Sequence, residues 1–123
     1  MIQVNFMTIT RNLKRIVLTL KTEKIGDDFF VTLTGGDVHI GAAALAFYDF
    51  KADQAICSVM TVSGHRENEI ALDGAERICN HTKKTVLFSA GIHLDNIFRD
   101  EIIEIQEACA EMIQDCLHQL EGQ

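Results

Sequence analysis

Hydrophobic and polar residues alternate in the first third of the chain. The alternation runs from Ile16 to Lys21, and a second strand-like segment covers residues 29–34. A period of two is typical of a strand with one buried face. Residues 24–28 between these segments contain a glycine and two aspartates, which favour a turn. The pattern therefore predicts a β-hairpin.

Apolar residues then form two longer runs, at residues 40–48 and 55–62, each bounded by turn residues. Their lengths favour buried strands over helices, although the first run is rich in alanine. Residues 70–79 place their apolar side chains at helical spacing, and residues 85–90 form a short β-branched strand that stops at Gly91. A final amphipathic helix is indicated by an apolar stripe that consists of Ile102, Ile105, Cys109, Met112, Cys116, Leu117 and Leu120.

These elements predict one α+β domain over residues 1–123. The first half is expected to be antiparallel, and the strand, helix and strand across residues 55–90 form a βαβ unit, for which a parallel crossover is expected. The fold expected is a mixed sheet of about five to six strands, with two helices packed mainly on one face.

Charge and composition narrow the function classes. The net charge of −7 and the pI near 5.1 argue against general binding to nucleic acid or to an anionic membrane, because both require a surplus of Lys and Arg. Residues 1–6 lack the pattern of an export signal, and no apolar stretch approaches the ~20 residues of a membrane span. A cytoplasmic location is expected. The four cysteines, Cys57, Cys79, Cys109 and Cys116, are expected to be buried free thiols.

Three loops combine glycine with histidine or acidic residues, at residues 35–41, 64–68 and 91–96. Glycine lets a backbone approach a ligand closely. The second and third loops each follow a strand and precede a helix, where free N–H groups and the helix dipole favour an anion. We therefore expect His65, Arg66, His93 and Asp95 to face one pocket. The candidate binding residues are Gly36, Asp37, His39, Gly41, Gly64, His65, Arg66, Gly91, His93, Asp95 and Asn96.

Each loop also has a purely structural interpretation. The first loop could be a tight hairpin turn supported by Asp37. The second could be a helix cap with Glu67 in the first turn, and in the third, Asp95 or Asn96 is a typical N-cap residue.

Catalytic interpretations find less support in the sequence. A metal site of His39, His65 and His93 with Asp37 or Asp95 would suit zinc or iron, but no local His spacing enforces such geometry. A nucleophilic enzyme is disfavoured because Ser63 lacks a glycine-flanked nucleophile elbow.

The three loop motifs together resemble those of the prenylated-flavin chaperone family. These motifs are GGDVHIG at residues 35–41, GHRE at residues 64–67 and AGIHLDNI at residues 90–97, and the resemblance extends from about Thr8 to Leu120. Members of this family are small subunits found with gallate-type decarboxylases that depend on prenylated FMN, and their fold is similar to that of the proteasome assembly chaperones.

The resemblance implies a non-catalytic protein that binds prenylated FMN or FMN and assists its delivery to, or maturation in, a partner decarboxylase subunit. The flavin phosphate would suit the helix N-termini after Gly64 and Gly91 with Arg66 pairing its charge, and the ring system would lie against Ile40, Ile92 and Leu94. Two alternatives stay open. One is a partner-docking subunit without a ligand, which could also form a homodimer. The other is a small metal-dependent enzyme that uses the three loop histidines.

Overall fold

The computed structural model describes residues 6–121, which form six strands and two helices. The strands are β1 (Phe6–Asn12), β2 (Val17–Ile25), β3 (Asp28–Gly36), β4 (Ala42–Asp49), β5 (Gln54–Thr61) and β6 (Val86–His93), and the helices are α1 (Asn68–Thr82) and α2 (Arg99–Glu121).

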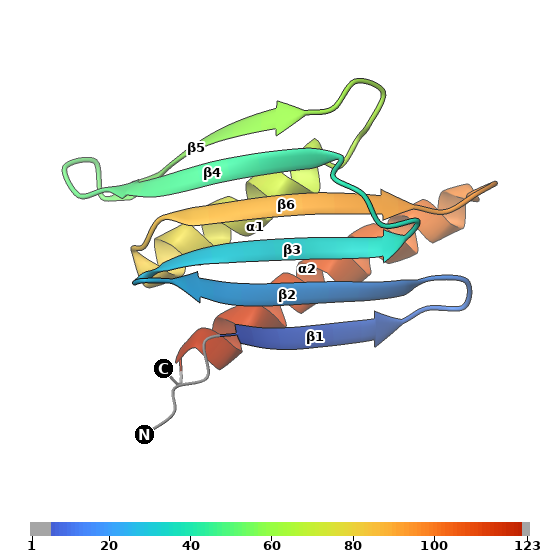
Figure 1. The fold of residues 1–123 in the computed structure, drawn as a ribbon, viewed down its shortest axis with the longest axis horizontal. Coiled ribbons are helices and arrows are strands. Elements are labelled where there is room, and N and C mark those ends of the chain that lie inside the picture. Colours follow the sequence, from blue (N-terminus) through green and yellow to red (C-terminus); the bar gives the residue numbers. More distant parts are fainter. Residues whose placement is uncertain (1–5, 122–123) are drawn as a thin grey trace.

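All six strands belong to one sheet with the order β1-β2-β3-β6-β4-β5, and both helices lie on the same face of it (Figure 1). Only the pair β3–β6 is parallel; the other four described pairs are antiparallel. The expected α+β class, the mixed sheet and the predicted hairpin of β2 and β3 are confirmed.

The order of the strands differs from the sequence prediction in two respects. Strand β1, which was not predicted, pairs with β2 at one edge of the sheet. Strand β6 lies between β3 and β4, so that β5 and β6 run in the same direction but are separated by β4 (Figure 1). The unit β5-α1-β6 therefore crosses over one intervening strand, and the parallel partner of β6 is β3.

The core lies between the sheet and the two helices. Strand residues that alternate along the chain are fully buried there, and α1 packs so closely that a Cβ on Gly74 would lie 2.3 Å from the ring of Phe88. On the opposite, open face of the sheet, the side chains of Leu45, Phe47 and Leu87 are exposed. One face of the sheet is thus covered by helices, and the other presents apolar side chains to its surroundings.

The cysteines are free thiols, as expected. Cys79, Cys109 and Cys116 are buried, whereas Cys57 is half-buried. Burial raises the pKa of the Cys109 thiol to about 12, so it is protonated and unreactive at neutral pH. Across residues 6–121, neither helix is long and apolar enough to cross a membrane.

Candidate functional site

The loop at residues 37–41 is the connection from β3 to β4, and it has to cross the end of β6. Backbone hydrogen bonds hold it there: the Asp37 amide donates to the His93 carbonyl (3.2 Å), and the Gly41 amide donates to the Ala90 carbonyl (2.9 Å). A Cβ on Gly91 would lie 1.6 Å from the carbonyl oxygen of His39. The interpretation as a hairpin turn is therefore wrong, because β6 separates β3 from β4.

The close approach of a side chain explains why position 41 is a glycine. A Cβ at that position would lie 2.2 Å from a carboxylate oxygen of Glu67. The first and second loops are thereby packed against each other. At Gly41 and Gly91, the absent side chain makes room for other parts of this chain.

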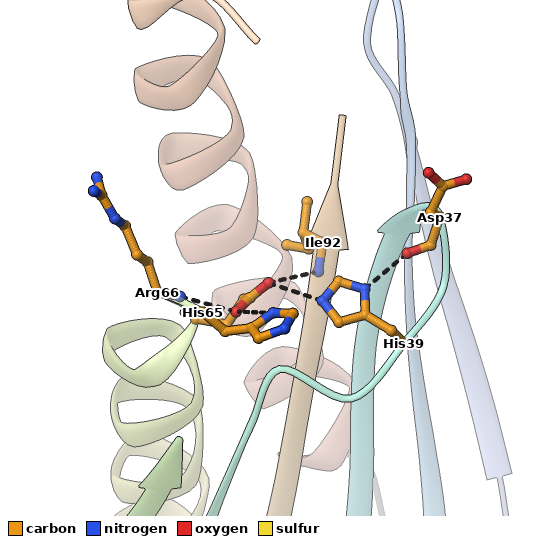
Figure 2. Close-up of polar contacts among 6 residues, drawn as sticks. Asp37, His39, His65, Arg66 and Ile92 are labelled. Atoms are coloured by element: carbon orange, nitrogen blue, oxygen red, sulfur yellow. Dashed lines mark hydrogen bonds and ion pairs between the residues drawn. The ribbon is translucent and has the colours of Figure 1, made fainter. Parts of the chain in front are cut away.

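This packing assembles a cluster of His39, His65 and Glu67, which we call the inner cluster. Oε1 of Glu67 lies 3.2 Å from Nε2 of His39, and Oε2 lies 3.6 Å from Nδ1 of His65. The two imidazole ring centroids are 4.9 Å apart. Both rings therefore face one carboxylate, as the dashed contacts in Figure 2 show.

Glu67 is the buried centre of the inner cluster, with 10% of its side chain exposed. It occupies the N-cap position of α1, and its carboxylate accepts hydrogen bonds from the backbone amides of Arg66 (3.1 Å) and Ile92 (3.3 Å). Burial acts to raise the pKa of Glu67, but hydrogen bonds from the backbone amides outweigh it and lower the pKa below its ordinary value. The carboxylate is therefore ionised at neutral pH.

The orientation of His39 is set by the loop itself. Its Nδ1 lies 2.8 Å from the carbonyl oxygen of Asp37 (Figure 2). A carbonyl oxygen only accepts hydrogen bonds, so Nδ1 carries the hydrogen and Nε2 is the atom presented to Glu67.

Asp37, His93 and Asp95 form a second group, which we call the outer cluster. Nε2 of His93 lies 2.8 Å from a carboxylate oxygen of Asp95, but both side chains are exposed. Arg15 holds the loop at residues 91–96 in place. Its guanidinium donates a hydrogen bond to the Asp95 carbonyl (2.8 Å) and forms an ion pair with Glu101 (2.9 Å). The third-loop histidine thus belongs to a group on the surface.

Arg66 does not share a pocket with the histidines. Its guanidinium points away from His65 and His39 in Figure 2 and lines a separate hollow of about 290 Å³ between α1 and α2, together with Glu69 and Asp73. The N-terminus of α1 is also supplied with an anion already, because the Glu67 carboxylate lies there. The expectation that His65, Arg66, His93 and Asp95 face one pocket is not met.

The third loop does not cap α2 in the way the sequence indicated. The helix begins at Arg99, and the carboxylate of Glu101 accepts a hydrogen bond from the Phe98 amide (2.9 Å), as in a capping box. Asn96 instead has a left-handed backbone with a φ of 53°. Asp95 and Asn96 are thus turn residues that precede the helix.

A hollow of about 430 Å³ opens beside His39 on the open face of the sheet. Its walls are mainly apolar, with Lys21 at one side. Of the residues expected to contact a ring system, Ile40 lines this hollow, whereas Ile92 and Leu94 are partly buried against the core. The hollow is lined by Lys21, Phe30, Thr32, Thr34, Val38, His39, Ile40, Ala43, Leu87 and Ser89.

The structure thus divides the predicted residues into several groups. His39 and His65 join the inner cluster, Asp37, His93 and Asp95 form the outer cluster, and Arg66 faces elsewhere. Gly36 and Gly64 have positive φ, and the space around Gly64 is open. Glu67 was expected only to cap a helix, and its place in the site was missed. The spacing His-x-Glu directly before a helix was the signal in the sequence that could have identified it.

Comparison with known proteins shows the family of this chain. No curated protein matches the sequence. A chain in the crystal structure of a chaperone complex for yeast 20S proteasome assembly has a similar fold, with a TM-score of 0.59 and 10% identity over 97% of this chain and 98% of that chain. The sequence matches the LpdD-like prenylated flavin chaperone domain over residues 12–121. The chain therefore belongs to the family of LpdD-like prenylated flavin chaperones.

Proposed function

We propose that this protein binds prenylated FMN or FMN and assists its transfer to, or maturation in, a partner decarboxylase, without catalysing a reaction itself. The observation that carries the proposal is the apolar hollow beside His39 in a member of this family. Its volume of about 430 Å³ exceeds that of the hollows beside Arg66 (about 290 Å³) and Arg15 (about 300 Å³). Pockets for small ligands are typically mainly apolar with a few polar groups, and this hollow has that character.

In this proposal the aromatic ring system lies against Phe30, Ile40 and Leu87, with the imidazole ring of His39 in the wall of the same hollow. The flavin phosphate pairs with Lys21, a cation at the side of the hollow. Arg66 is a weaker candidate for the phosphate than the sequence indicated, because Glu69 and Asp73 line the same hollow and repel an anion.

The partner decarboxylase would dock on the open face of the sheet. The hollow lies on this face, and exposed apolar side chains continue beyond it at Leu45, Phe47 and Met60. An exposed apolar surface of this kind marks an interaction site in many proteins. Docking there would bring the partner next to the bound flavin.

The test is an anaerobic titration of the purified protein with FMN and with prenylated FMN, followed by absorbance and calorimetry. We expect saturable binding that Lys21→Ala weakens about tenfold, the scale of one lost charge-assisted hydrogen bond. Arg66→Ala serves as the matched control and should leave the affinity unchanged.

Two outcomes would revise the proposal. If Arg66→Ala weakens binding and Lys21→Ala does not, the phosphate binds in the hollow between α1 and α2. If neither flavin binds, the carrier function is wrong, and the protein is better described as a docking subunit.

A further inference from the structure

The inner cluster contains more acceptors than donors when its imidazoles are neutral. Because Nδ1 of His39 donates to the Asp37 carbonyl, Nε2 of a neutral His39 presents a lone pair to Oε1 of Glu67 at 3.2 Å. Two lone pairs at this distance repel each other. A positive species between these atoms, either a proton or a metal cation, turns the repulsion into attraction.

We propose that His39, His65 and Glu67 bind a divalent metal cation of the zinc class. Imidazole nitrogen and carboxylate oxygen are ligands that zinc and iron accept, and two histidines with one carboxylate is a recurring set for both metals. One ligand atom from each of the three residues lies within 4.8 Å of the others.

The distances within the cluster suit a common ion. Two ligands bound at about 2.0–2.1 Å with a tetrahedral angle between them lie about 3.3 Å apart. The His39–Glu67 contact of 3.2 Å and the His65–Glu67 contact of 3.6 Å lie on either side of this value. The two contacts run to different oxygens of the carboxylate, Oε1 for His39 and Oε2 for His65, so an ion bound by both rings lies beside the Glu67 carboxylate and contacts one or both of its oxygens.

The hydrogen bonds that hold the three ligand side chains are also typical of a metal site. Metal-binding histidines usually donate their second ring N–H to a carbonyl or carboxylate, as His39 does to Asp37. The Glu67 carboxylate is held by the amides of Arg66 and Ile92. These contacts orient the ligands before any ion binds.

One bound metal ion accounts for two histidines beside one carboxylate better than protonation of both imidazole rings does. Two protonated imidazoles would place two positive rings with centroids 4.9 Å apart beside a single carboxylate. One divalent cation shared by two neutral rings places the charge at one point next to Glu67. With three protein ligands, a tetrahedral ion keeps one position for water or an exchangeable anion.

The test uses the full chain, stripped with a chelator and titrated with Zn²⁺ and with Co²⁺ in the absence of flavin. We expect one ion per chain and a visible cobalt spectrum of a four-coordinate site without a thiolate band. His39→Ala, His65→Ala and Glu67→Gln should each weaken Zn²⁺ binding at least about tenfold. The affinity should stay unchanged in His118→Ala, on the surface of α2, and in His93→Ala, in the outer cluster.

Three results would overturn the proposal. They are the absence of stoichiometric binding, a Zn²⁺ affinity of the three ligand variants equal to that of the unsubstituted protein, and a thiolate band that places the ion on a cysteine. Circular dichroism checks that each variant folds. If Glu67→Gln does not fold, the two histidine variants decide, because their side chains are partly exposed. No flavin is present, so the result is independent of the flavin titration.

Discussion

The inner and outer clusters contain the same kinds of side chain at different depths. Each includes a histidine next to a carboxylate, at 3.2 Å in the inner cluster and at 2.8 Å in the outer one. The exposed fraction of the carboxylate side chain is 10% for Glu67 and 81% for Asp95. Water screens the contact in the outer cluster, whereas backbone amides hold the buried carboxylate of Glu67, so the inner cluster is expected to contribute more to stability.

This comparison shows that burial and backbone support decide what a polar contact contributes. Glu67 accepts hydrogen bonds from two backbone amides, and it packs against Gly41. The Asp95 carboxylate contacts His93 at the surface, where water can replace it. The inner cluster is thus a structural junction between two loops, whereas the outer cluster is a group of exposed polar side chains.

The largest effect on stability is expected from Gly91→Ala, because Gly91 lies against the backbone of the loop that contains His39. The new Cβ would meet the His39 carbonyl at 1.6 Å, so the loop at residues 37–41 would have to move. We expect the free energy of unfolding, measured by urea denaturation, to fall by about 3 kcal/mol or more. Gly64→Ala is the control: its φ of 84° is strained for alanine, but the space around it is open, so about 1–2 kcal/mol is expected. Equal costs for both variants would contradict the assigned role of Gly91.

A smaller loss is expected from Glu67→Ala, which tests the inner cluster directly. The substitution leaves the part-buried amides of Arg66 and Ile92 without their acceptor. In metal-free protein we expect a loss of about 2–3 kcal/mol in the free energy of unfolding. Glu67→Gln should lose less, because its amide keeps an acceptor oxygen and can donate to Nε2 of His39. A loss for Glu67→Ala no greater than that for Asp95→Ala would show that the two clusters are equivalent.

The smallest effect is expected from Asp95→Ala in the outer cluster. Exposed polar contacts contribute little, so the free energy of unfolding should change by less than about 0.5 kcal/mol. The backbone carbonyl of residue 95, which accepts from Arg15, is kept in this variant. A larger loss, measured by the same denaturation, would mean that the exposed carboxylate has a structural role.

The local pattern of the sequence determined most of the elements. Alternation identified β2 and β3, helical spacing identified α1 and α2, and the apolar runs identified β4 and β5, because each signal depends on neighbours within a few residues. The glycine- and histidine-bearing loops were also visible in the sequence, and His39 and His65 do lie together. β1 was not predicted, because a short edge strand with polar residues has a weak periodic signal.

The tertiary structure alone decided how these pieces meet. The insertion of β6 between β3 and β4 depends on pairing between distant segments, which leaves no trace in local periodicity. Because of that insertion, the loop at residues 37–41 crosses β6, and Gly91 lies against the backbone carbonyl of His39. Glu67 is buried between two histidines as a result. The side chain of Arg66 lines the hollow between α1 and α2 and points away from the two histidines. The sequence by itself determined which residues could form a site, and the packing of distant backbone segments determined which of them do, because burial and distance are properties of the whole fold.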